Sequence, residues 1–141
     1  PRMLAEMEKG AGKAGRSARG FEVVCRFQTW VTDDPKGARG LIRRFMAGYF
    51  TTSVYNSFAE WCGFETEARE MREAWARRDR EATERAFTDD MIDRIALVGD
   101  AKTVRRKLEE FIAAGVTTPL IHAFAPSPEE AWRTIETLAP R

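Results

Sequence analysis

The sequence predicts an α/β protein that is mostly helical and contains two parallel strands. The first observation is a run rich in Val, Phe, Trp and Thr at residues 21–32, which contains neither Gly nor Pro and is typical of a strand. The second is a shorter apolar run at residues 117–124. Between them, apolar residues recur at helical spacing. Two strands joined by helical crossovers favour parallel pairing.

The N-terminal part of the sequence predicts a helix followed by the first strand. Residues 3–9 are helix formers, and the Gly-rich stretch after them predicts the end of that helix. In the strand over 21–32, successive side chains point to opposite faces. We expect the apolar set on one face to pack under helices: Val23, Cys25 and Phe27. The other face, which we expect to look into the protein's interior, carries Val24, Arg26, Gln28 and Trp30.

Four helices are predicted between the first strand and Gly99. A fifth helix then leads into the second strand. Asp34 followed by Pro35 predicts a helix start, because Asp caps a helix and proline is tolerated at its first position. A further helix is predicted over 52–62, and a charge-dense helix over 65–86. Thr88 predicts the cap of a helix that ends at Gly99.

The C-terminal part predicts a helix, a strand and a final helix. Asp100 caps the first of these, and Gly115 ends it. Because a strand begins almost at once, we expect Gly115 to adopt a left-handed conformation. Pro119 is unusual in a central strand. Ser127 and Pro128 predict the start of the last helix.

Composition limits the classes of function. The 141 residues correspond to one domain, and 23 basic against 22 acidic residues give a net charge of +1, which argues against a nucleic-acid partner. No apolar run approaches the ~18 residues of a membrane span, and the first residues do not read as a signal peptide. Cys25 and Cys62 are isolated and the chain has one histidine, so we expect no metal site and a reducing, cytoplasmic setting.

The predicted strands do not make a complete sheet. Two strands alone leave unpaired edges on both sides. The sequence also opens without Met, at Pro1, within residues that predict a helix. We therefore expect residues 1–141 to be a single partial domain whose other strands lie upstream.

Three stretches follow one another in a definite order. The first is Ala14-Gly15-Arg16 about five residues before a strand, followed by Val31-Thr32-Asp33-Asp34-Pro35. The second is an Arg-rich helical excursion that ends in residues 96–99. The third is Val98-Gly99-Asp100, a helix, and Ala114-Gly115-Val116 before a strand. This ordered set resembles the C-terminal part of the luciferase-like monooxygenase family, which includes flavin-dependent and deazaflavin-dependent oxidoreductases.

The resemblance implies the C-terminal portion of a (β/α)8 barrel, with residues 21–32 as its seventh strand, 117–124 as its eighth and 51–98 as a helical insertion beside the mouth. It implies an oxidoreductase that carries out two-electron chemistry, by hydride transfer or monooxygenation, on a small organic substrate with FMN or coenzyme F-420.

The resemblance names no catalytic residue in this chain. Much of the family's cofactor cradle comes from earlier strands, so we expect the main catalytic site to lie upstream of Pro1. For the same reason we expect the fragment alone to be inactive.

Residues at the predicted barrel mouth are candidates for the cofactor or substrate pocket. Barrel active sites lie at the carboxyl ends of strands, and a ring held for hydride transfer needs apolar walls with a few polar groups. The first strand offers Arg26, Gln28 and Trp30, and the second offers His122 and Phe124. Each of three also has a structural alternative: Trp30 as core packing, Arg26 as an internal ion-pair member and His122 as a structural histidine.

The sequence leaves a second function open, a non-catalytic helical interaction or assembly module built on residues 41–98. Its aromatic density suits a buried protein interface. The residues concerned are Phe45, Tyr49, Phe50, Tyr55, Phe58 and Trp61. A homo-oligomer, the choice between FMN and F-420, the substrate and the involvement of oxygen also stay open.

Overall fold

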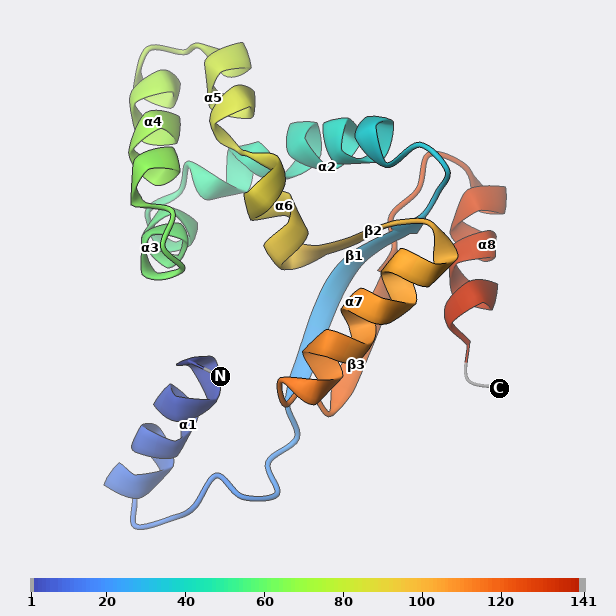
Figure 1. Cartoon of the computed structure of the whole chain (residues 1–141). Helices are drawn as coiled ribbons and strands as arrows, with labels where there is room; N and C mark the ends of the chain where they lie inside the picture. The colour runs from blue at the N-terminus through green and yellow to red at the C-terminus, as the bar shows by residue number, and fades with distance from the viewer. Residues whose placement is uncertain (1, 140–141) are drawn as a thin grey trace.

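The computed structural model describes residues 2–139 as three strands and eight helices (Figure 1). In chain order the elements are α1 (Arg2–Lys13), β1 (Val24–Val31), α2 (Pro35–Phe50), α3 (Ser53–Trp61), α4 (Glu65–Ala76), α5 (Arg80–Ala86), α6 (Asp89–Ile95), β2 (Ala96–Gly99), α7 (Ala101–Ala113), β3 (Thr118–Ala123) and α8 (Pro128–Leu138). The predicted α/β class with parallel strands is confirmed.

Pro1, Pro140 and Arg141, at the two ends of the chain, lie outside the described residues. The main catalytic site upstream of Pro1 and the assignment of residues 1–141 to one partial domain stay predictions.

The strands form one parallel sheet in the order β2-β1-β3, so β1 is central. The structure corrects the number of strands from two to three. The added strand is β2, residues 96–99, which the sequence assigned to the end of a helix. Its four residues are all buried, and so short an apolar run has no alternation that distinguishes a strand from a buried helical turn.

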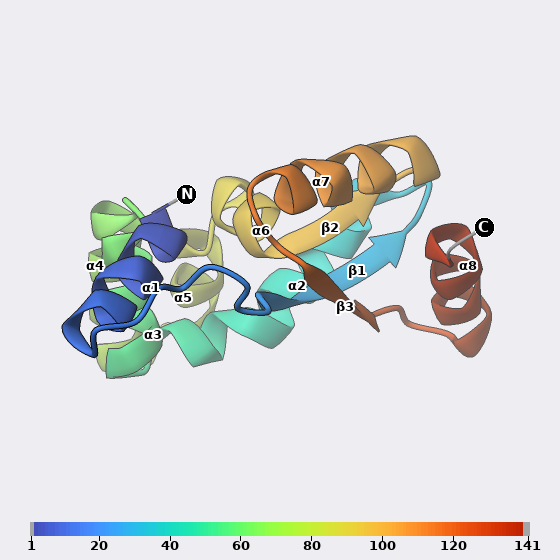
Figure 2. The same ribbon diagram turned by 90° about the horizontal axis from the view of Figure 1, so that it is seen from below.

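One face of the sheet packs under α7 (Figure 2). Phe27 of β1 and Leu97 of β2 are buried in one cluster with Val104 of α7, and Cys25 packs against it. The ring of Phe27 lies 4.6 Å from the ring of Phe111. The expectation that Cys25 and Phe27 pack under helices is confirmed. Val23, which was expected with them, is half-buried just before β1 and is not part of this cluster.

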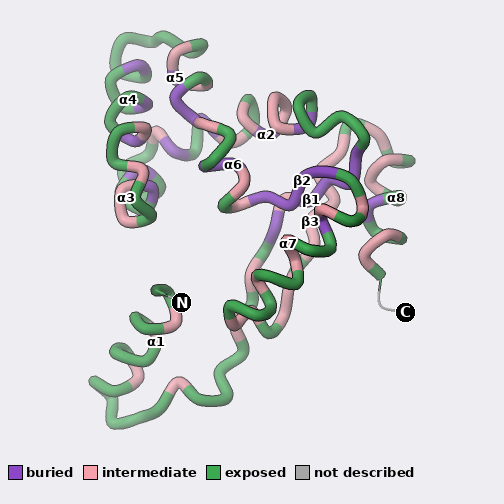
Figure 3. Tube along the Cα trace, in the orientation of Figure 1, coloured by how far each residue is buried: buried purple, intermediate pink, exposed green. Residues whose placement is uncertain are grey.

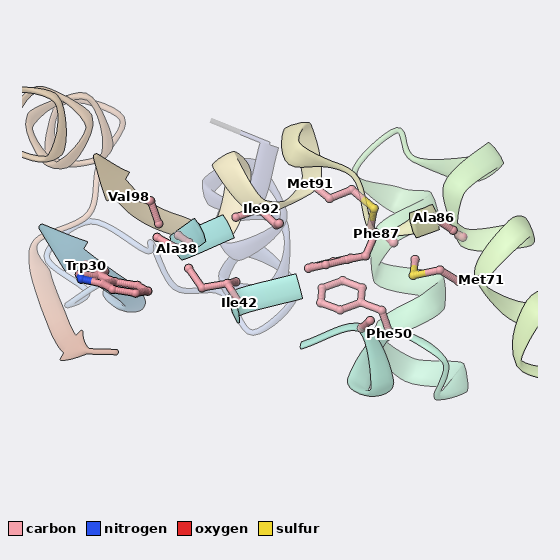
Figure 4. Packing of buried hydrophobic residues seen from close by; sticks show 14 residues of the cluster. Trp30, Ala38, Ile42, Phe50, Met71, Ala86, Phe87, Met91, Ile92 and Val98 are labelled. Carbon is pink, nitrogen blue, oxygen red and sulfur yellow. The ribbon is translucent and has the colours of Figure 1, made fainter. Parts of the chain in front are cut away.

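The opposite face is covered by α2 near the carboxyl ends of the strands (Figure 4). There Trp30 and Val98 pack in one cluster with Ala38 and Ile42 of α2, because α2 begins directly after β1 and crosses back over the sheet. Toward the amino ends the same face is open, and Val24 is 56% exposed. Figure 3 shows this contrast along β1, which is buried toward its carboxyl end beside β2 and exposed toward its amino end, and it shows further buried stretches in α3, α4 and α5.

The helices α3 to α6 form a lobe beside the sheet (Figure 1). The single helix predicted over 65–86 is two helices, because Arg78 has φ of 59° and reverses the chain, while Asp79 accepts a hydrogen bond from Ala82 N as the cap of α5. The lobe ends at Ile95. The predicted insertion over 51–98 therefore includes the first residues of β2, and its role as an insertion stays a prediction.

The first helix is longer than the sequence indicated. It continues through Gly10 and Gly12 to Lys13, although a glycine inside a helix costs about 1 kcal/mol relative to alanine. Its side chains are exposed or half-buried, and the helix stands apart from the sheet (Figures 1 and 3).

The connection from α7 to β3 explains two features of the sequence. Gly115 has φ of +110°, which confirms the predicted left-handed conformation. The backbone N–H of Thr118 donates to Val23 O, so the nitrogen of the next residue, Pro119, faces the other edge of β3. Pro119 therefore removes no hydrogen bond from the pairing with β1.

Candidate functional site

Three of the predicted site residues contact one another on the open face of the sheet. Gln28 of β1 lies opposite His122 of β3 in the strand register. The side chain of Arg26, one step back along that face, places Nη2 3.0 Å from His122 Nδ1. The amide oxygen Oε1 of Gln28 is also within hydrogen-bond distance of Nδ1. The structure therefore brings Arg26, Gln28 and His122 into one polar cluster.

Both contacts meet at one nitrogen of the His122 ring. A guanidinium group only donates hydrogen bonds, so Nδ1 accepts in the contact with Arg26, whereas Gln28 Oε1 accepts, so Nδ1 donates in the contact with Gln28. The tautomer of His122 decides which of the two contacts is the hydrogen bond. In either case Arg26 and Gln28 hold the ring at Nδ1 and leave Nε2 for another partner.

Trp30 lies two residues further along the same face and is 7% exposed. Its ring packs in the cluster with Ile42 and Val98, which fits the structural alternative of core packing. Its indole Nε1 is buried and has no hydrogen-bond partner within residues 2–139. A buried donor without a partner costs about 1–3 kcal/mol of folding free energy, a cost that the apolar atoms around this nitrogen do not have.

Phe124 joins the polar cluster to a row of aromatic rings on α2. Its ring centroid is 6.1 Å from that of His122 and 5.0 Å from that of Phe45, and Phe45 is 6.0 Å from Tyr49. The sequence placed Phe45 and Tyr49 in a separate interaction surface. No local sequence pattern indicates that Phe45 meets Phe124, because this contact depends on how α2 crosses the ends of the strands.

A second apolar region lies at the opposite ends of the strands. A cavity of about 400 Å3 between α1, β1 and the end of α7 is lined by residues that include Leu4, Cys25 and Phe111. The side chain of Arg26 borders it. Burial raises the pKa of the Cys25 thiol, which lowers its thiolate fraction. Because barrel chemistry takes place at the carboxyl ends, this cavity lies outside the candidate site.

Two kinds of site are not found in the part of the chain that the structure describes. Residues 2–139 hold no group of three or more His, Cys, Asp or Glu side chains arranged to bind a metal ion. No helix among these residues is both long and apolar enough to span a membrane.

Known proteins are similar to this chain over most of its length. A putative coenzyme F-420-dependent oxidoreductase of Mycobacterium tuberculosis is 25% identical over 125 residues, which are 83% of this chain and 36% of that protein. The solved structure of a coenzyme F-420-dependent tetrahydromethanopterin reductase from Methanopyrus kandleri superposes with a TM-score of 0.69 at 26% identity, over 94% of this chain and 38% of the reductase. This chain thus spans little more than a third of the length of either protein.

The family profile agrees with the fold and with the order of the sequence motifs. The luciferase-like monooxygenase profile matches residues 2–118, from α1 to the start of β3. Together with the structural match, it supports the barrel portion implied by the sequence. The chain belongs to the luciferase-like monooxygenase family.

Proposed function

We propose that this chain is the C-terminal part of an oxidoreductase that uses coenzyme F-420 to reduce or oxidise a small organic substrate. The observation that carries the proposal is that the two relatives, one matched by sequence and one by structure, are both named as F-420-dependent. Of the two cofactors that the sequence leaves open, this favours F-420 over FMN. A deazaflavin does not activate oxygen as a reduced flavin does, so the proposed reaction is a reduction or dehydrogenation.

The open face of the sheet has the groups that such a cofactor or its substrate needs. The imidazole of His122 and the amide of Gln28 are hydrogen-bonding groups for oxygen or nitrogen atoms of a ligand. Phe124 supplies an apolar wall beside them. We infer that Gln28, Trp30, His122 and Phe124 border the cofactor ring or the substrate. When bound, F-420 supplies the two-electron hydride chemistry.

Arg26 has a positioning role in this proposal. Its guanidinium lies 3.0 Å from Nδ1 of His122 and holds the ring at that atom. Gln28 holds the ring from the neighbouring position in the register. The isolated thiols Cys25 and Cys62 suit the reducing cytoplasm that we propose as the location of the enzyme.

The catalytic residues of the proposed enzyme belong to the strands expected upstream of Pro1. The polar cluster of Arg26, Gln28 and His122 complements them from the last strands of the barrel. In this proposal the described residues bind and orient the cofactor or substrate, and the fragment alone does not turn over.

The test is to titrate the full-length protein with F-420 and, separately, with FMN, and to follow the absorbance of each cofactor. We expect F-420 to bind. Gln28→Ala is expected to weaken binding or turnover about tenfold while leaving the melting temperature unchanged, because Gln28 lies on the open face. Binding of FMN without F-420 would overturn the choice of cofactor, and binding of neither would overturn the oxidoreductase.

Phe27→Ala is the matched control on the other face of β1. Phe27 is 1% exposed and packs against Phe111. We expect its replacement to lower the free energy of unfolding by about 3–5 kcal/mol. If Phe27→Ala spared stability but abolished cofactor binding, the two faces of β1 would have the opposite roles.

A further inference from the structure

The cavity at the amino ends of the strands combines apolar walls with positive charge. Its volume of about 400 Å3 is within the range of about 300–1,000 Å3 that is typical of small-molecule pockets. Most of its walls are apolar side chains of α1, β1, α3, α6 and α7. Among the described residues, the charged side chains that line it are Arg26 of β1 and Arg94 of α6, and no acidic side chain lines it. The cavity is therefore apolar and carries two positive charges.

The positive charge of these two arginines is not compensated by a carboxylate. Within residues 2–139, neither guanidinium forms an ion pair with an Asp or Glu side chain. Arg26 contacts the imidazole of His122, and the guanidinium of Arg94 lies 5.9 Å from the centroid of the Phe64 ring. Asp93, next to Arg94 on α6, is already paired with two other cations. Both arginines can therefore bind an anion from outside these residues.

The edge of β1 beside the cavity adds a backbone donor. Phe124 N donates to Thr29 O, so the odd-numbered residues of β1 turn their backbone groups toward β3. Arg26 is even-numbered and turns its N–H to the opposite edge, where β2 pairs with β1 only from Gln28 onward. No backbone oxygen of residues 2–139 outside β1 and its paired strands accepts from this N–H. A carboxylate at this edge accepts from the backbone and from the guanidinium of the same residue.

The apolar part of the cavity is accessible from solvent. Met3 of α1 is 51% exposed, Val24 of β1 is 56% exposed and Phe58 of α3 is 37% exposed, and all three line the cavity. A ligand can therefore enter past these side chains. Covering them with an apolar chain removes hydrophobic surface from water, which favours binding.

We propose that this cavity binds a medium-chain aliphatic carboxylate, whose head contacts Arg94 and Arg26 and whose chain lies against the apolar walls. The charges select an anion, and the walls select an apolar chain. The cavity is at the opposite ends of the strands from the candidate site, so this ligand is neither the cofactor nor the substrate of the proposed function. Arg26 is the residue that the two sites share.

Three probes separate the head from the chain. Octanoate carries both, octan-1-ol has the same chain without the charge, and butanoate has the charge on a shorter chain. In calorimetric titrations of the full-length protein we expect octan-1-ol to bind about tenfold more weakly than octanoate, because it loses hydrogen bonds between charged groups. We expect butanoate to be weaker than octanoate by at least about tenfold, since each buried methylene contributes about threefold to fourfold.

Arg94→Gln tests the head contact outside the candidate site. Arg94 is exposed, so the variant should keep the melting temperature of the unmodified protein. We expect it to weaken octanoate about threefold to tenfold and to leave octan-1-ol unchanged. Arg69→Gln is the matched control: Arg69 is an exposed arginine of α4 that does not line the cavity, and neither affinity should change.

Cys25 reports where the probe binds without any variant. It is a free cysteine that lines the cavity. We expect octanoate to slow the labelling of Cys25 by N-ethylmaleimide, followed by mass spectrometry of the peptide that contains it. Butanoate at the same concentration should give little protection. Binding of octanoate without protection of Cys25 would place it elsewhere and overturn the proposal.

Three further results would overturn it. Failure of octanoate to bind the full-length protein is the result expected if another strand of the protein paired with the free edge of β1 and filled the cavity. Equal affinities for octanoate and octan-1-ol would show that the arginines do not bind the head. Unchanged octanoate affinity in Arg94→Gln would remove the contact on which the proposal depends. F-420 binding is measured separately, so failure of the proposed function is distinguished from failure of this site.

Discussion

The hydroxyl group of Thr134 in α8 accepts a hydrogen bond from the backbone N–H of Val31 over 3.1 Å. Val31 is the last residue of β1, and the register with β3 already ends where Thr29 faces Ala123. Thr134 therefore supplies the acceptor that a longer β3 would have offered. Its own hydroxyl hydrogen goes to Glu130 O, 2.9 Å away, so a buried side chain is fully satisfied.

Thr134→Val should destabilise the protein by about 1–3 kcal/mol, because it keeps the shape of the side chain but leaves the buried N–H of Val31 without an acceptor. The measurement is urea denaturation of the full-length protein. Thr134→Ser is the control and should recover most of the loss, since it restores the oxygen. Equal stabilities for the Val and Ser variants would show that the hydroxyl does not fix α8 to the sheet.

The second prediction concerns the turn at Gly115. Its φ of +110° is a conformation that side chains resist, and a Cβ there would also lie 2.5 Å from a methyl carbon of Leu4. Gly115→Val should therefore lower the free energy of unfolding by more than about 1 kcal/mol. Gly12→Ala is the control inside α1, where nothing lies within 4 Å, and it should be neutral or stabilise by up to about 1 kcal/mol. Unchanged stability in Gly115→Val would contradict the strained turn.

The sequence predicted the two longer strands and their faces because alternation over many residues is a strong signal. Arg26, Gln28 and Trp30 are on one face of β1 and Phe27 on the other, as the period of two requires. It did not predict β2, whose four residues carry no periodicity. Nor did it predict the break at Arg78, where a non-glycine residue adopts a positive φ that no residue preference indicates.

The candidate site was only partly predictable for a different reason. Parity along the strands placed Gln28 and His122 on mouth-facing positions, but their contact depends on the register of β1 with β3, which no local pattern specifies. The same holds for Phe45, which meets Phe124 only because α2 crosses the ends of the strands. No sequence pattern indicates that the N–H of Trp30 lacks an acceptor, because this depends on how the ring packs.

The third prediction concerns Asn56 of α3, whose side chain makes three hydrogen bonds to α2 and α4. Its buried Nδ2 donates to Phe50 O at 2.9 Å and to Ala68 O at 2.8 Å, and its Oδ1 accepts from Arg72. Asn56→Asp would place a carboxylate against two carbonyl oxygens. We expect a loss of about 2–3 kcal/mol in the free energy of unfolding. Arg72→Met removes only one of the three hydrogen bonds and should lower the free energy of unfolding by less than Asn56→Asp. A larger loss in Arg72→Met would contradict the central role of Asn56 in these contacts.

The last prediction concerns the charges around Asp93 on α6, which tie three helices together. Arg39 of α2 donates to both carboxylate oxygens, and Lys107 Nζ of α7 lies 3.0 Å from Oδ1. Burial acts to raise the pKa of Asp93, but the hydrogen bonds and positive charges of Arg39 and Lys107 outweigh it and hold that pKa below the ordinary 3.8. The carboxylate is partly exposed, so we expect Asp93→Asn to cost only about 1–2 kcal/mol at pH 7.

The sign of the pH dependence follows from that lowered pKa. The ionised form is favoured by the folded state, so the contribution of Asp93 is complete above the unfolded pKa of about 3.9 and is lost as pH falls through the folded pKa. The free energy of unfolding should therefore fall less between pH 6 and pH 3 in Asp93→Asn than in the unmodified protein. Glu81→Gln is the control, because the pair of Glu81 with Arg85 is almost fully exposed and should shift stability by less than about 0.5 kcal/mol. Parallel pH curves for Asp93→Asn and the unmodified protein would mean that Asp93 has the same proton affinity in the folded and unfolded states, and would contradict the prediction.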